Sequence, residues 1–217
     1  MFENLPDPFL IIAGLTILSL APFVAIMVTS YVKLVVVFSL VRNALGIQQI
    51  PPNMVLNGMA VILTLFIMAP LASEIHDVVR DEDFSDRSVE NMLVIGEKAQ
   101  EPFREFLLRH CHDNTRIFFI KAARQLWPPE KAKNLDDASL IILIPSFAVS
   151  ELTAAFEIGF LIYLPFIAID LIISNILMAM GMMMVSPMTI SLPFKLLLFV
   201  LLDGWQTLIY GLIMTYS

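Results

Sequence analysis

Long runs without any charged side chain dominate this sequence. Residues 8–32, 43–73 and 171–194 contain no Asp, Glu, Lys or Arg. The stretch 139–164 is interrupted only by Glu151 and Glu157, and residues 196–216 carry only Asp203. A helix that crosses a membrane needs about 20 apolar residues, so each stretch is long enough for one crossing. The pattern predicts an all-α, integral membrane-type protein.

Charged residues gather in one interval between the apolar blocks. Ten of the 13 Lys and Arg residues lie between Glu74 and Asp137, as do 14 of the 20 acidic residues. Only 15% of the 217 residues are charged, against about 25% in a typical soluble domain. The distribution predicts a first apolar helical hairpin (1–73), a polar helical insert (74–137), and a second apolar hairpin with a methionine-rich loop (138–217).

Proline and glycine predict where the hairpins turn. The segment "GIQQIPPN" carries Gly46 and two prolines, and "VSPMTISLP" carries Pro187 and Pro193. Because proline lacks a backbone donor and restricts the residue before it, both segments are predicted to be turns. Pro22 and Pro165 lie within apolar stretches and predict kinks inside long helices. The predicted arms are 9–41 with 54–73, and 139–186 with 193–215.

The polar insert has the pattern of a small folded helical region. The segment "DNTRIFFIKAARQLWPP" opens with Asp113 or Asn114 as the helix cap and ends at two prolines, which predicts one helix between them. The segment "EPFREFLLRHC" places Phe103, Phe106 and Leu107 at helical spacing, which predicts a second helix with one apolar face.

Composition and side-chain chemistry exclude several classes of function. A net charge of −7 argues against nucleic acid, because phosphate binding needs concentrated Lys and Arg. Cys111 is the single cysteine, so an intrachain disulfide cannot form. With His110 and His112 it offers too few ligands for a structural zinc site, and we expect a surface cluster there. No cofactor, metal or catalytic arrangement is predicted. The acidic start predicts that residues 9–20 form a retained helix rather than a cleaved signal.

Carboxylates inside apolar helices are the main candidates for buried functional charges. Glu151, Glu157 and Asp170 all lie in such sequence. A charge there is costly and usually faces protein, water or a partner. Glu151 and Glu157 are about 120° apart around a helix, so they do not form a paired acid/base site. We expect pairs across helices or subunits with the bases of the apolar blocks. These bases are Lys33, Arg42 and Lys195. Asp203 and Lys195 are eight residues apart, so we expect them to share one helix surface without direct contact. The alternative is proton- or ion-coupled transport through the carboxylates.

Methionine is concentrated in one short segment. Residues 178–188 read "MAMGMMMVSPM" and hold six of the 13 methionines. Gly181 and Pro187 mark the place where a helix should end, so the segment is predicted to be a flexible apolar loop. Such a loop at membrane depth is tolerated only when it is buried in protein or lines a cavity. Copies that converge in a ring would form a soft, deformable constriction. The central residues are Met182, Met183 and Met184, flanked by Met178, Met180, Gly181, Pro187 and Met188.

The charges near the turns predict an orientation. Arg42 lies near the first turn and Lys195 near the second, whereas the insert has ten bases and 14 acids, a net charge of −4. Basic residues favour the cytoplasmic side. The insert is therefore predicted to lie outside the cytoplasm.

Two long segments resemble a known family. They are "SYVKLVVVFSLVRNALGIQQIPPNMVLNGMAVILTLFIMAP" and "LIPSFAVSELTAAFEIGFLIYLPFIAIDLIISNILMAMGMMMVSPMTISLPFKLLLFVLLDGW". Both closely resemble the FliP/SctR family, the R-type subunit of the type III secretion export apparatus. The chain starts almost directly with an apolar stretch, so it is more similar to the injectisome (YscR-like) branch than to flagellar members.

The resemblance implies an assembly in the bacterial inner membrane that protrudes to the periplasmic side. Family members form a homo-pentamer, which FliR/SctT-type, FliQ/SctS-type and FlhB/SctU-type subunits complete. The pore of this assembly exports unfolded effector and needle proteins. The family's methionine gasket maps onto Met182, Met183 and Met184, which would seal the closed pore. Much of the apolar sequence would then be buried in the assembly rather than in lipid.

Overall fold

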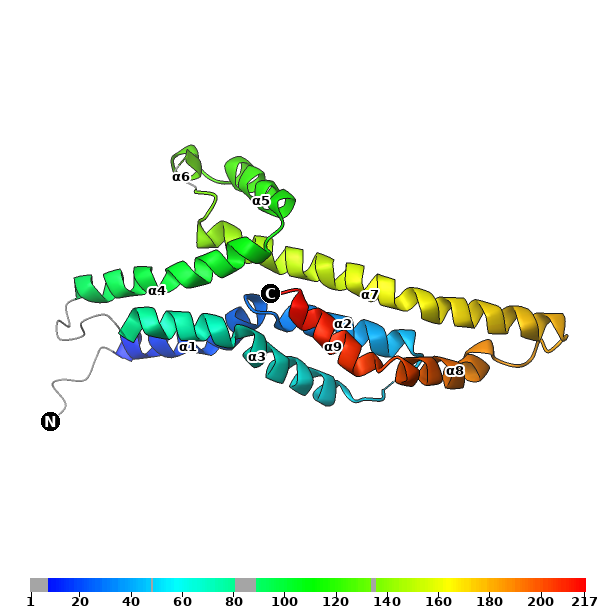
Figure 1. The fold of residues 1–217 in the computed structure, drawn as a ribbon. Helices are drawn as coiled ribbons and strands as arrows, with labels where there is room; N and C mark the ends of the chain where they lie inside the picture. Colours follow the sequence, from blue (N-terminus) through cyan, green and yellow to red (C-terminus); the bar gives the residue numbers. More distant parts are fainter. Residues whose placement is uncertain (1–7, 48, 81–88, 134–135) are drawn as a thin grey trace.

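The computed structural model describes residues 8–47, 49–80, 89–133 and 136–217, and every regular element among them is an α-helix (Figure 1). The predicted all-α fold is therefore confirmed. In chain order the helices are α1 (Pro8–Met27), α2 (Tyr31–Ala44), α3 (Asn53–Arg80), α4 (Val89–His110), α5 (Asp113–Leu126), α6 (Pro129–Lys133), α7 (Leu140–Ala179), α8 (Pro187–Leu201) and α9 (Gly204–Met214).

Helix α7 is the 40-residue axis of the molecule, and α2 packs along it. Figure 1 shows α7 running from the insert helices at one end to the methionine-rich loop at the other. The helices approach closely at Gly159, where an added Cβ would lie 2.2 Å from Leu40 Cδ1. Pro165 lies inside α7 without ending it, as predicted. The buried residues of α2 lie on the face toward this core: Lys33, Leu34, Val37, Phe38, Val41 and Ala44.

The insert helices pack on the first turns of α7. Leu107 of α4 is fully buried with Leu143 and Phe147, and Phe103 and Phe106 pack around them as their spacing predicts. On α5, Ile120 and Ala123 are buried against Ile142. The helix expected to be capped by Asp113 or Asn114 begins at Asp113 itself, with His112 in the cap position. Neither predicted residue is therefore the cap, and the Asp113 side chain bonds to Arg116 within the first turn of the helix.

Two breaks in the helices differ from the predictions. Pro22 is not one of them, because it lies inside α1 without ending it, as predicted. The helix is interrupted at residues 28–30, between α1 and α2, and this segment contains no glycine or proline. The predicted arm 193–215 is two helices bent by 59°, because Asp203 adopts a left-handed backbone (φ 47°) before Gly204. Helix α8 begins at Pro187, which is well suited to a first helical position. The second turn is therefore residues 180–186 and not 185–193.

Two helices among the described residues, α3 and α7, are long and apolar enough to cross a membrane. The bent pair α8 and α9 makes a third if it counts as one span. Only 11% of the most apolar window of α7 is buried within the chain. A helix that is so apolar and so exposed must be covered by lipid or by other proteins.

Candidate functional site

Hydrogen bonds at the end of α7 and a proline at the start of α8 define the methionine-rich loop, residues 180–186. The N–H of Met182 donates to Leu177 O (2.9 Å) and that of Gly181 to Met178 O (3.0 Å), which is the Schellman arrangement that ends many helices. Gly181 has φ +72°, a conformation that a side chain would strain. Helix α8 then starts at Pro187 after Ser186. Glycine and proline thus fix where α7 stops and α8 starts, as the sequence predicts.

The side chains of this loop are exposed in the single chain. Met182 is 41% exposed, Met183 85% and Met184 102%. The flanking Met178, Met180 and Met188 are also exposed. None of these side chains contributes to the core of the chain, so core packing does not explain why methionine is concentrated here. A cluster of exposed apolar side chains of this kind is typical of a surface that an assembly covers.

An ion pair fixes the base of the α7–α8 hairpin that carries the loop. The Nζ of Lys195 lies 2.6 Å from Asp170 Oδ2 and donates to Ala44 O at the end of α2 (3.1 Å). The hydroxyl of Ser191 donates to the other oxygen of the same carboxylate (2.6 Å). Lys195 is buried and Asp170 is 32% exposed. The pair therefore joins α2, α7 and α8 on the loop side of the core.

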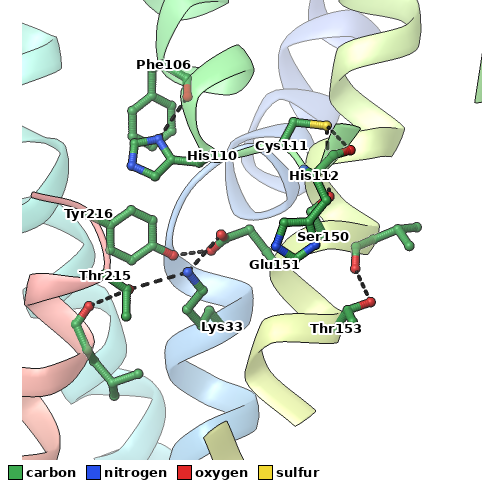
Figure 2. Close-up of polar contacts among 12 residues, drawn as sticks. Lys33, Phe106, His110, Cys111, His112, Ser150, Glu151, Thr153, Thr215 and Tyr216 are labelled. Atoms are coloured by element: carbon green, nitrogen blue, oxygen red, sulfur yellow. Dashed lines mark hydrogen bonds and ion pairs between the residues drawn. The ribbon is translucent and has the colours of Figure 1, made fainter. Parts of the chain in front are cut away.

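A second ion pair lies near the insert and is almost sealed from solvent. The Nζ of Lys33 is 2.9 Å from Glu151 Oε1, with side chains 5% and 3% exposed. The C-terminal residues complete this junction (Figure 2): the Tyr216 hydroxyl donates to Glu151 Oε2, and Lys33 lies over the Tyr216 ring, 4.2 Å from its centroid. Lys33 also donates to the Thr215 hydroxyl (3.4 Å). The chain end thus shields the charges that join α2 to α7.

Residues 110–112, between α4 and α5, pack next to this junction. The ring of His110 packs against both Phe106 and Tyr216, with centroids 4.6 and 5.2 Å away, and those two rings also stack on each other at 6.5 Å. Cys111 is buried, and the Ser150 hydroxyl donates to its sulfur (3.9 Å; Figure 2). Burial raises the pKa of the Cys111 thiol, which favours the protonated, unreactive form. Only His112 is exposed, so the predicted surface cluster was wrong for Cys111, which faces Ser150 on α7.

The structure brings together four of the seven predicted charges. Lys33 pairs with Glu151, and Lys195 pairs with Asp170, both within one chain. Among the described residues, the three others form no ion pair. Arg42 donates to Asn53 Oδ1 and Pro51 O in the turn after α2. Glu157 is exposed on α7. Asp203 is exposed at the α8–α9 break, so it does not share a surface with the buried Lys195.

Three participants in these junctions were not identified in the sequence: Ser191, Thr215 and Tyr216. Each is bonded to a charged residue far away along the chain. No local pattern marks such a residue. An aromatic or hydroxyl side chain in an apolar segment is the one feature that could indicate such a contact, and residues that only pack in the core have the same feature.

Comparison with known proteins identifies the family. The sequence pattern of the FliP family matches residues 14–212. The chain is 55% identical over 214 residues to Yop proteins translocation protein R of Yersinia pestis, which covers 99% of both chains. It is 49% identical to Hypersensitivity response secretion protein HrcR of Ralstonia nicotianae (99% of both chains) and 48% identical to Virulence protein YscR of Salmonella typhimurium (99% of this chain, 100% of the relative). The chain therefore belongs to the FliP family, together with relatives named for protein translocation and secretion.

Proposed function

We propose that this chain is a core subunit of the type III secretion export gate, in which several copies line a pore for unfolded effector and needle proteins. The observation that carries the proposal is the methionine-rich loop. Its three central side chains are exposed in the single chain, and the buried Lys195 holds the hairpin that presents them. The names and full-length similarity of the relatives support a role in secretion.

In this proposal Met182, Met183 and Met184 form the seal of the closed pore. A narrow neck of apolar side chains excludes water and ions. Methionine has three rotatable bonds and a polarizable sulfur, so its side chain adapts to irregular surfaces. A ring of such side chains can close on itself at rest and on chains of different sequence during export. The exposed flanking methionines extend the same surface.

The ring is a homo-pentamer in this proposal, and FliR/SctT-type, FliQ/SctS-type and FlhB/SctU-type subunits complete it in the inner membrane. The particle extracted in mild detergent should therefore have the mass of five copies or more. Mass photometry or native mass spectrometry measures this directly. A particle with the mass of one or two copies, from cells that make all the partner subunits, would contradict the proposal.

The transporter alternative has less support than the export gate. Coupled transport needs carboxylates that gain and lose protons. Glu151 and Asp170 are instead held by lysines, and Glu151 also accepts the Tyr216 hydroxyl. This arrangement suits a fixed structural joint better than a proton relay.

The orientation of the insert is part of the proposal. A reporter enzyme that works only in the periplasm, inserted beside the exposed Glu130 of α6, should be active, since basic residues near both turns favour the cytoplasmic side. The matched fusion in the turn beside Gln49 should be inactive. The reverse pair of activities would show that the insert faces the cytoplasm. Arg87, at another position in the insert, lies outside the described residues.

A further inference from the structure

The face of α7 that points away from α2 carries one carboxylate in an apolar surface. Glu157 is exposed, and no hydrogen bond or ion pair involves it within the described chain. Apart from Thr153, whose hydroxyl donates to Val149 O (2.9 Å), the exposed side chains around it along α7 are large and apolar: Leu152, Phe156, Phe160, Leu161 and Leu164. Towards the C-terminal end of α7 the apolar surface continues with Leu171 and Ile172, whose side chains are 60% and 57% exposed.

Helix geometry explains why Glu157 points outward. Ala155 and Gly159 are buried on the α2 side of the helix. Glu157 is two residues from each of them, which corresponds to about 200° of rotation around the axis. It therefore cannot reach Lys33, which the neighbouring Glu151 binds on the inner face.

An isolated carboxylate on a surface this apolar needs a counterpart. Charged side chains at membrane depth almost always face a partner charge or a water-filled cavity. Lipid tails would cover the aromatic and leucine side chains here but would leave the carboxylate unsatisfied. The combination of an apolar surface and one acid is complementary to a helix that carries one base among apolar residues.

In a second copy of this chain, the described bases of the apolar blocks are already bonded, and the insert helices α4 and α5 pack farther along α7, against residues 142–147. The three bases of the apolar blocks are engaged: Lys33 with Glu151, Lys195 with Asp170, and Arg42 with Asn53. In the insert, Arg109 and Arg116 are bonded to Glu105 and Asp113. Helix α5 packs near Ile142, which is 15 residues, or roughly 22 Å, along α7 from Glu157.

We propose that Glu157 and the apolar face around it bind a helix of a different polypeptide, one that presents a Lys or Arg at the height of Glu157. The proposal rests on the proposed function only in requiring an assembly of different chains. It identifies the outward face of α7 as the surface that binds the partner helix, and Glu157 as the residue that makes this surface specific for a helix with a base. Arginine suits the site well, because its guanidinium can bind a carboxylate through two parallel hydrogen bonds.

Photo-crosslinking in the native complex tests this directly. A photoreactive amino acid replaces Phe160, which is 61% exposed and one turn from Glu157. After illumination of membranes from cells with the complete apparatus, we expect an adduct with a different polypeptide. Mass spectrometry of that adduct should place the attachment within about two helical turns of a Lys or Arg. Glu157→Gln should lower the adduct yield about tenfold, as the loss of roughly one charge-assisted contact implies.

Matched controls separate a lost contact from a lost fold. Glu130→Gln removes an exposed acid in the insert and should leave the adduct yield unchanged. Because Glu157 is exposed, the Glu157→Gln chain should keep the parent's elution and heat stability. An adduct only with another copy of this chain, or only with lipid, would overturn the proposal. So would fast labelling of Glu157→Cys by a membrane-impermeant thiol reagent in a Cys111→Ser background, which would place the residue in water. Particle mass tests the export-gate proposal separately, so the two can fail independently.

Discussion

Glu151→Ala should leave little folded, extractable protein. The change removes one partner of an ion pair whose side chains are 5% and 3% exposed, so the Lys33 ammonium stays buried without its counter-ion. Breaking such a pair typically costs about 3–5 kcal/mol, a large part of the roughly 5–15 kcal/mol that stabilises a native protein. Fluorescence-detected size-exclusion chromatography of detergent extracts, repeated after heating, measures the surviving folded fraction.

Two controls show whether charge burial causes this loss. Glu105→Ala removes a 70% exposed partner of Arg109, which should cost less than about 1 kcal/mol and leave the elution profile unchanged. Replacing both partners together, Lys33→Met with Glu151→Leu, should recover much of the folded fraction, because no charge then remains buried. A Glu151→Ala chain that elutes and resists heat like the parent would show that the pair contributes little.

The C-terminal contact should produce a smaller loss at the same junction. Tyr216→Phe keeps the ring over Lys33 and removes only the hydroxyl that donates to Glu151. A hydrogen bond to a charged group contributes about 1.5–3 kcal/mol. The chain should therefore fold but lose heat stability, whereas Tyr210→Phe, at an exposed position, should not.

Hydropathy and local breakers predict the parts of this fold that depend on neighbours in sequence. The apolar stretches locate α3 and α7, and Gly181 with Pro187 locate the loop. The break at Asp203 could also have been found, since Asp followed by Gly is a strong turn signal. The break at residues 28–30 could not, because Val28, Thr29 and Ser30 carry no such signal.

The pairing of charges depends on tertiary structure and was only partly accessible. The sequence shows that carboxylates in apolar helices need partners. It does not show that Lys33 meets Glu151 while Lys195 meets Asp170, since helices far apart in the chain bring them together. Nor does it show that Glu157 faces outward, because that depends on which side of α7 receives α2.

Replacing Met182, Met183 and Met184 together by alanine should make the assembled complex leak. All three side chains are exposed in the single chain, so their loss should leave the fold and the ring intact. Burial of one methionine side chain contributes about 1.5–3 kcal/mol. Loss of one such contact from the closed neck would therefore shift the balance toward the open state roughly tenfold or more. Single replacements should leak less, because neighbouring methionines can fill the gap.

Leucine is the matched control for this change. It keeps the apolar volume but loses the unbranched, adaptable shape of methionine. The triple leucine variant should seal at rest and export more slowly than the parent. Gel filtration of each complex confirms that assembly is unchanged before any leak is compared.

The most direct measurement is the ion conductance of the purified complex in a planar bilayer without substrate. The parent and the triple leucine complex should be silent, and the triple alanine complex should conduct. If the fully assembled triple alanine complex is as tight as the parent, the loop does not seal a pore and its methionines serve another contact.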